Sequence, residues 1–232
     1  MQDEIRKHTK KVYDTLNSPT QMFGEKAKEV FIEIATIVFA ILLSTYIHGQ
    51  TEHAHEQVEV KAFITDLRQD LEKDINDMNI GIKYFDDYSK RITFLLNITD
   101  TQRDSLNKVK SNVNIFGPLG NSIYNTGAYE GFKSSGKVGN IENSTLKRNI
   151  LFYYQQQLPD IFRSETLSTT NIYTLKEAYL NIGQKEKLLK NRKIRIILTE
   201  AFGYSKMMIE VYQKAIVTAK EVTKEIDKEL AE

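Results

Sequence analysis

The sequence contains no cysteine and no tryptophan, and its 232 residues include only 3 prolines and 11 glycines. Without cysteine, the chain can form no disulfide, no thiolate metal site and no cysteine nucleophile. Proline and glycine are the residues that interrupt helices, so their scarcity favours a chain made mostly of long helices. We therefore predict an all-α protein.

An excess of charge of one sign is also missing. The 32 Lys and Arg residues against 31 Asp and Glu residues give a formal net charge of +1, and no long acidic or basic block occurs. A chain with this balance has no overall field that attracts polyanions. We therefore expect no nucleic-acid partner.

The longest apolar run is VFIEIATIVFAILLSTYI, Val30–Ile47, in which Glu33 is the one charged residue. Eighteen helical residues span roughly 27 Å, close to the hydrocarbon thickness of a bilayer. A signal peptide would begin nearer the N-terminus, and the rest of the chain lacks the apolar surface to enclose such a helix in a soluble core. We predict a transmembrane helix at residues 30–47.

Flanking charge predicts the orientation of this span. The residues shortly before it include four lysines, Lys10, Lys11, Lys26 and Lys28. The twenty residues after it contain only Lys61. By the positive-inside rule, residues 1–29 form a cytoplasmic amphipathic tail, and residues 48–232 lie on the periplasmic side of the inner membrane.

Glu33 has two interpretations. A carboxylate inside a membrane can relay protons or contact another helix in an oligomer. Alternatively, Glu33 lies one turn inside the cytoplasmic boundary and extends toward lipid headgroups or toward Lys26 and Lys28. Glu33 is in either case the candidate residue for an intramembrane polar or oligomer contact.

Two long stretches carry apolar residues at helical steps of three and four. The first contains Val60, Ile64, Leu67, Leu71, Ile75, Met78, Ile82, Phe85, Tyr88, Ile92 and Leu95. The second contains Ile194, Leu198, Ala201, Ser205, Met208, Tyr212, Ala215, Ala219, Val222, Ile226 and Leu230. These spacings predict two stem helices, residues 48–97 and 191–232, that pair antiparallel like a coiled coil in an elongated bundle.

Residues 98–190, between the stems, are predicted to form a small helical head with loops. We expect a helix over NILFYYQQQL that ends at Pro159, because proline lacks the N–H that a helix needs. The next segment, SETLSTTN, is polar and reads as a linker before another helix from Ile172 to about Lys190.

The run GFKSSGKV, residues 131–138, has the glycine and lysine spacing of a phosphate-binding loop. Such a loop needs a buried strand before it and a Ser or Thr after Lys137, where this chain has Val138. We instead predict a short helix from Ala128 to Ser135 that buries Tyr129 and Phe132. In this interpretation Gly136 is the left-handed cap, Asn143 and Ser144 begin the next helix, and no nucleotide binds.

The segment AYEGFKSSGKVGNIENSTLKRNILFYY, with EIATIVFAILLSTYI and DLRQDLEKDI, resembles an uncharacterised family of single-pass helical membrane proteins common in Bacteroidota. Members pair a Glu-containing span with a segment of the pattern SSGK…I.N..LR..I..YY. The resemblance covers roughly residues 25–160, and the His-rich stretch after the span departs from it. It implies a membrane anchor and an all-helical exterior, and it adds no catalytic residue.

Two other groups of residues are candidates for binding. His48, Glu52, His55 and Glu59 share one helical face, which suits a divalent metal or pH sensing, although a solvated helix surface explains the same pattern. Three aromatic residues of the head, Phe116, Tyr124 and Tyr129, either form a partner-contact loop or fill the core. We predict neither a bound metal nor a cofactor.

A membrane anchor, two apolar seams and no set of catalytic groups favour a non-enzymatic interaction or scaffold protein. Its expected partners are membrane lipid and either further copies of itself or another envelope protein. The alternative is an oligomeric membrane assembly, pore-forming or signalling, that uses the transmembrane helix and Glu33. An enzyme is the least supported class, since residues 56–232 contain no histidine.

Overall fold

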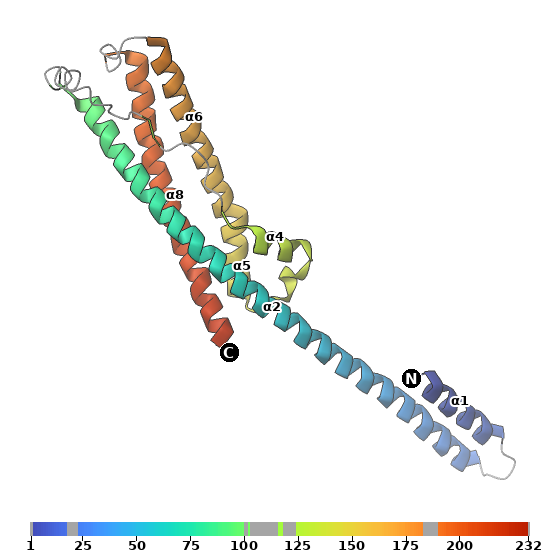
Figure 1. Cartoon of the computed structure of the whole chain (residues 1–232). Coiled ribbons are helices and arrows are strands. Elements are labelled where there is room, and N and C mark those ends of the chain that lie inside the picture. Colours follow the sequence, from blue (N-terminus) through green and yellow to red (C-terminus); the bar gives the residue numbers. More distant parts are fainter. Residues whose placement is uncertain are drawn as a thin grey trace. The chain divides into compact units, whose positions relative to one another are not determined.

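The computed structural model describes residues 2–17, 23–99, 102, 116–117, 124–182 and 190–231. Every regular element within these ranges is helical, which confirms the prediction of an all-α protein. The chain divides into two compact units, Met1–Glu59 and Val60–Glu232 (Figure 1).

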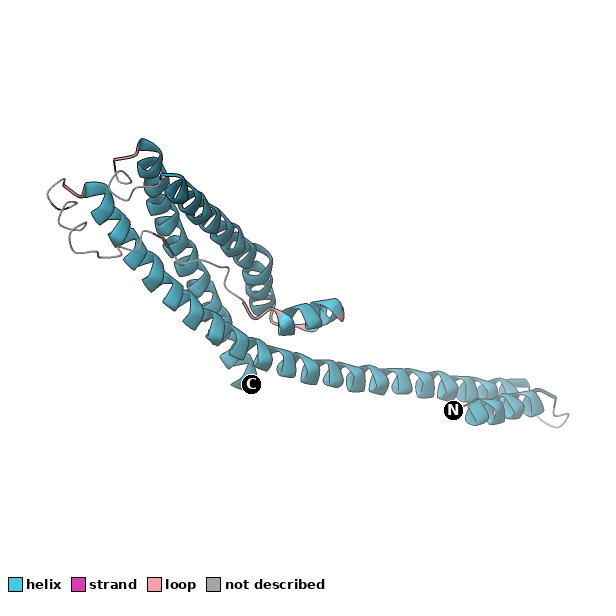
Figure 2. Ribbon diagram, turned by 45° about the horizontal axis from the view of Figure 1, so that its top comes forward, coloured by secondary structure: helices cyan, strands magenta, loops and turns pink. Residues whose placement is uncertain are grey.

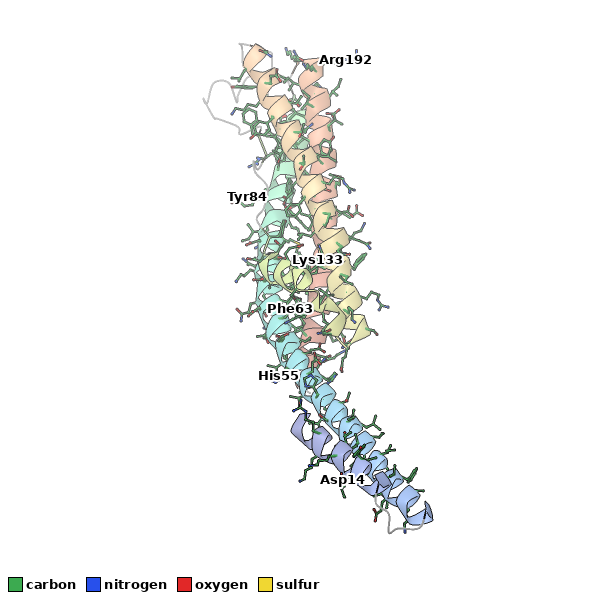
Figure 3. All side chains as sticks on the ribbon, turned by 90° about the vertical axis from the view of Figure 1, so that its right-hand side faces the viewer. Asp14, His55, Phe63, Tyr84, Lys133 and Arg192 are labelled. Carbon is green, nitrogen blue, oxygen red and sulfur yellow. The ribbon has the colours of Figure 1, made fainter. Side chains whose placement is uncertain are left out.

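The first unit contains α1 (Gln2–Asn17) and the N-terminal part of α2 (Phe23–Asn97). Figures 1 and 3 show α1 lying beside this part of α2. Within the described residues, α2 is the one helix whose length and composition suit a membrane span. The apolar side chains there are exposed, with Phe31 at 73% and Leu42 at 64%. A core helix of a soluble protein would be covered instead.

The second unit is built on three long helices (Figure 2). They are the part of α2 from Val60 onward, α6 (Leu158–Ile182) and α8 (Arg192–Ala231). Shorter elements, α4 (Gly127–Ser134), η1 (Lys137–Asn140), α5 (Ser144–Phe152) and η2 (Tyr153–Gln157), precede α6 in the sequence.

The two predicted stems pack antiparallel. Near one end of the pair, Arg68 Nε donates to Asp227 Oδ1 at 2.6 Å. Near the other end, Arg195 Nη2 donates to the Leu96 carbonyl at 3.1 Å. Because the partner's number in α8 falls as the number in α2 rises, the predicted direction of pairing is confirmed.

The predicted seam of α8 is buried at every position except Leu230, which is 37% exposed. In α2 the prediction is less accurate at two positions. Ile75 and Ile82 are only partly buried. Asp74 enters the core in place of Ile75 and is 0% exposed, and Gly81 faces the Tyr212 ring in place of Ile82.

Two predictions about α6 are wrong. Pro159 does not end the preceding helix, and the SETLSTTN segment is not a linker, because both lie inside α6. The turn before Pro159 is the π-helical segment η2. A π turn shifts the hydrogen-bond ladder by one residue, so it can accommodate both the proline ring and the missing N–H. The helix predicted from Ile172 is the continuation of α6, which ends at Ile182.

The cap interpretation of GFKSSGKV is confirmed. α4 buries Tyr129 and Phe132, and Gly136 follows with φ +75°, the left-handed conformation that glycine adopts without strain. Asn143 then caps α5, because its Oδ1 accepts the Leu146 N–H at 3.0 Å. Residues 124–126, directly before α4, are not a strand. The Phe132 ring stacks on Phe63 with centroids 3.9 Å apart, which fixes α4 against α2.

The packing of α2 on α8 predicts opposite effects for the same substitution at two helical glycines. A Cβ at Gly81 would lie 2.5 Å from Tyr212 Cε2, and the Tyr212 hydroxyl is held by Glu165 at 2.8 Å. We expect Gly81→Ala to lower the melting temperature, although alanine favours a helix over glycine by about 1 kcal/mol. A Cβ at Gly203 would meet nothing within 4 Å, so Gly203→Ala should raise the melting temperature. Thermal circular dichroism of both variants measures this, and equal stabilisation would contradict the packing.

Candidate functional site

The second unit contains a buried acidic residue that belongs to no predicted site. Asp74 of α2 is 0% exposed. Its Oδ1 accepts the Asn125 backbone N–H at 3.0 Å and Asn125 Nδ2 at 2.8 Å. Its Oδ2 accepts the Tyr153 hydroxyl at 3.3 Å. Burial raises the pKa of Asp74, and the hydrogen bonds from Asn125 and Tyr153 oppose part of that rise.

A second buried carboxylate, Glu165 of α6, is 2% exposed. Its Oε1 accepts two phenolic hydroxyls, from Tyr124 at 3.1 Å and from Tyr212 of α8 at 2.8 Å. We call the set Asp74, Tyr124, Asn125, Tyr153, Glu165 and Tyr212 the carboxylate network. Tyr124 and Asn125 are adjacent, so two carboxylates from different helices hold one short stretch of chain inside the bundle.

Further tyrosines surround the carboxylate network. Tyr129 stacks on Tyr154 with centroids 4.3 Å apart and planes 7° apart. Gln155 Nε2 donates to the Tyr129 hydroxyl at 2.9 Å, which connects α4 to η2. Burial raises the pKa of Tyr153 and of Tyr154, and the nearby Asp74 charge raises both further. These phenols therefore stay protonated and can donate hydrogen bonds.

The hydrogen bonds of the carboxylate network are suited to a structural role within the bundle. The carboxylate oxygens of the network accept hydrogen bonds from the protein's own tyrosine and asparagine groups, and both side chains are shielded from solvent. A carboxylate that acts on a substrate must reach it within hydrogen-bond distance. As arranged, Asp74 and Glu165 position residues 124–125.

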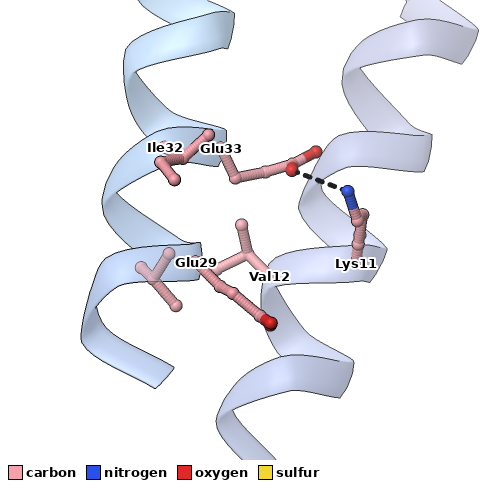
Figure 4. A pocket seen from close by; sticks show the side chains of 6 residues that line it. Lys11, Val12, Glu29, Ile32 and Glu33 are labelled. Carbon is pink, nitrogen blue, oxygen red and sulfur yellow. Dashed lines mark hydrogen bonds and ion pairs between the residues drawn. The ribbon is translucent and has the colours of Figure 1, made fainter. Parts of the chain in front are cut away.

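Glu33, the predicted intramembrane residue, is 8% exposed and has a partner in its own chain. Its Oε2 accepts a hydrogen bond from Lys11 Nζ of α1 at 3.1 Å (Figure 4). The two groups lie at a cavity of about 210 Å³, lined by Lys11, Val12, Glu29, Val30, Ile32 and Glu33. The first unit therefore supplies a charge partner for Glu33.

The four residues of the predicted metal or pH-sensing face do lie on one helix, α2. His48 has an 83% exposed side chain, and its Nε2 is 4.0 Å from Glu52 Oε2. His55 and Glu59 are also exposed. In the part of the chain that the structure describes, no three His, Asp or Glu residues are placed to share a metal ion.

The three aromatic residues predicted to form a partner-contact loop are buried to different extents. Tyr124 is 6% exposed and Tyr129 is 1% exposed, and both belong to the core of the second unit. Phe116 is half-buried and meets the Tyr179 ring edge-on at 5.7 Å.

Asp74 and Glu165 are absent from the sites predicted from the sequence, although the sequence contains a signal for each. Leu71, Asp74 and Met78 are separated by three and four residues, which is the spacing of a buried seam. The spacing around Glu165 is also that of a seam, with Ile161 four residues before it and Ser168 three residues after it. A polar residue at a seam position is a candidate for a buried hydrogen-bond network, because a seam position is buried whatever residue occupies it.

Comparison with protein-family models, with curated proteins and with solved structures found no match to this chain.

Proposed function

We propose that the protein is a membrane-anchored, non-enzymatic scaffold that presents a helical bundle on the periplasmic side of the inner membrane. The observation that carries the proposal is the run Val30–Ile47, which is apolar and exposed to solvent. An exposed surface of this kind is unfavourable in water, and a bilayer covers it completely. The resemblance to a family of single-pass helical membrane proteins supports the membrane anchor.

The distribution of lysines supports the proposed orientation. Four lysines lie in the twenty residues before the span and one lies in the twenty residues after it. Basic residues are retained on the cytoplasmic side during insertion. The bundle from Val60 onward then lies outside the cytoplasm, where an interaction partner in the envelope can reach it.

The buried chemistry of the bundle supports a scaffold over an enzyme. The carboxylate network holds residues 124–125 against α2, α6 and α8, and its acidic groups are shielded from solvent. Polar networks of this kind rigidify a core and specify one arrangement of helices. A rigid bundle presents a constant surface to a partner.

A membrane anchor requires a rearrangement of α1. The exposed α1 residues Arg6, Lys7 and Lys10 would each cost about 2.5–3.5 kcal/mol in hydrocarbon, so α1 must leave the inserted part of α2 for the membrane surface. This movement takes Lys11 away from Glu33. The Glu33–Lys11 contact therefore does not favour the scaffold over an assembly that depends on Glu33.

The absence of cysteine gives a direct test of topology. We would place one cysteine at an exposed position on each side of the span, Lys10→Cys in α1 and Lys176→Cys in α6. In intact spheroplasts treated with a membrane-impermeant maleimide, we expect labelling at position 176 and none at position 10. Lysed cells should label at both positions.

The reverse pattern would place the bundle in the cytoplasm. Labelling at both positions in sealed spheroplasts would contradict a span at Val30–Ile47 and therefore the membrane-anchored scaffold itself.

A further inference from the structure

The outer face of α6 is exposed, yet it carries no charge over several turns. Among its apolar side chains, Leu167 is 44% exposed, Tyr173 is 57% exposed and Leu180 is 69% exposed. Between Arg163 and Lys176 the one charged residue is Glu165, which is buried. Since 27% of the whole chain is charged, an uncharged exposed face of this length is a candidate contact surface.

The residues of this face follow the spacing of a helix-pairing seam. Arg163, Thr166, Thr170, Tyr173, Glu177 and Leu180 are separated by three, four, three, four and three residues. This spacing keeps them in one stripe along α6. The stripe lies opposite the seam through Ile161, Glu165, Ser168, Ile172 and Leu175, which α6 buries within its own bundle. Among the described residues, α6 therefore has two seams, one buried within its own bundle and one exposed.

The threonines of the outer seam can be buried at low cost. Thr166 Oγ1 donates to the Phe162 carbonyl and Thr170 Oγ1 to the Thr166 carbonyl, each at 2.8 Å. Thr174 Oγ1 donates to the Thr170 carbonyl at 3.0 Å. Since each hydroxyl proton already has an acceptor in α6, covering this face leaves no threonine donor unsatisfied.

The charges at the ends of the outer seam favour one direction of pairing, and Arg163 would keep or exchange the bond that its Nη1 donates to Asp160 Oδ1 at 3.1 Å within α6. Arg163 lies seven residues before Thr170 and Glu177 lies seven residues after it. If two copies of the face meet antiparallel with Thr170 opposite Thr170, each Arg163 meets the other copy's Glu177. In the same arrangement Leu167 of one copy and Tyr173 of the other, three residues on either side of Thr170, lie at the same level on opposite flanks of the seam. A parallel pairing would instead set arginine against arginine and glutamate against glutamate.

We propose that the outer face of α6 binds the same face of a second copy, antiparallel about a two-fold axis at Thr170. A two-fold interface uses one self-complementary patch twice, as this charge order requires. The inference names the partner and the surface of the proposed scaffold function, and it rests on that function.

Cysteine cross-linking of the full-length protein tests the contact. Thr170→Cys should form a disulfide-linked dimer under mild oxidation in detergent, because the axis brings the two positions together. The matched control is Thr199→Cys in α8, an equally exposed threonine whose hydroxyl bonds to the carbonyl four residues earlier, at 2.9 Å. It should remain monomeric. Cross-linking at both positions to the same extent, or at neither, would overturn the proposal.

Two further cysteines determine the direction of pairing. A mixture of Arg163→Cys and Glu177→Cys proteins should cross-link to each other. Neither variant should cross-link to itself, since in the antiparallel pair the same position on two copies is about 21 Å apart. Self-cross-linking of each single variant without the mixed product would establish a parallel pair and overturn the inference.

Charge reversal provides a test that does not depend on cysteine. Arg163→Glu places two acidic groups together at each end of the seam, so the dimer should dissociate at least tenfold more readily in sedimentation experiments. The double variant Arg163→Glu/Glu177→Arg restores opposite charges and should recover the dimer. If the reversed single variant dimerises unchanged, or the double variant stays monomeric, the α6 interface is wrong.

The same preparations separate this inference from the proposed function. Membrane retention of each variant is measured before detergent is added. If the protein stays in the membrane but shows no α6 cross-link, the proposed dimer is wrong and the proposed membrane anchor is not affected. If the unmodified protein is lost from the membrane, the proposed membrane-anchored scaffold is wrong, whatever the cross-linking shows. Capture of a different protein by Thr170→Cys in place of a second copy would also overturn the inference.

Discussion

Arginine at both Val38 and Leu42 is expected to release the protein from membranes. These residues lie one turn apart near the middle of the exposed apolar run, where Val38 is 49% and Leu42 is 64% exposed. Each arginine at the centre of a spanning helix costs about 2.5–3.5 kcal/mol, so the pair opposes insertion by roughly 5–7 kcal/mol. Carbonate extraction of membranes followed by immunoblotting measures the retained fraction, which should fall from nearly all of the protein to a minor part.

The bundle offers a matched control for this pair. Ile80 and Tyr84 of α2 are also four residues apart, and they are 44% and 61% exposed. Arginine at both of these positions adds the same charge to the same helix, outside the apolar run. We expect this control to remain in the membrane. If both double variants are retained, or both are released, the apolar run is not what anchors the protein.

Replacing Asp74 with alanine is expected to destabilise the bundle by about 3–5 kcal/mol. The substitution removes the acceptor of three hydrogen bonds and leaves the Asn125 backbone N–H, the Asn125 side chain and the Tyr153 hydroxyl without their partner. Near-UV circular dichroism of the tyrosines follows thermal unfolding, and the midpoint should fall by about 10 °C. An unchanged midpoint would contradict the buried position of Asp74.

Asp74→Asn separates the hydrogen bonds from the charge. Its amide oxygen can still accept from Asn125, so we expect a smaller loss than with alanine. The pKa of Asp74 is raised in the folded state above its ordinary value of 3.8. A raised pKa gives a contribution to stability that is complete below that value and is lost as pH rises through the folded-state pKa. The stability of the unmodified protein relative to Asp74→Asn should therefore fall as pH rises from 3.8.

The spacing of apolar residues predicted the long helices and their direction of pairing because most buried positions in a seam are apolar. In α2 it failed where a seam position is charged or is a glycine. In α2 the strict alternation of three and four passes through Asp74 and Gly81, whereas a search for apolar residues moved one position on, to Ile75 and Ile82. The correct register of the α2 seam is therefore present in the sequence. It is hard to recognise because Asp74 is charged and Gly81 has no side chain.

The same cause explains the errors in α6. SETLSTTN has the composition of a linker, but Ser164, Glu165, Ser168 and Asn171 are all buried within helix–helix contacts. Whether such polar groups can be buried depends on donors from elsewhere in the chain, such as the Tyr212 hydroxyl that bonds to Glu165. These donors lie far away in sequence, so local composition cannot reveal them. The glycine cap at Gly136 was predictable because its cause is local.

The antiparallel pairing of α2 with α8 sets the order in which the protein can fold during synthesis. Arg68 and Asp227 are partners across 159 positions of sequence. At about 5–20 residues per second, translation separates them by roughly 10–30 s. Throughout that interval the seam of α2 lacks its contact with α8, which follows the other described helices in the sequence. Loss of the final turns of α8 would expose the part of that seam near Arg68, so a truncation within α8 should be as damaging to this protein as a lesion in its core.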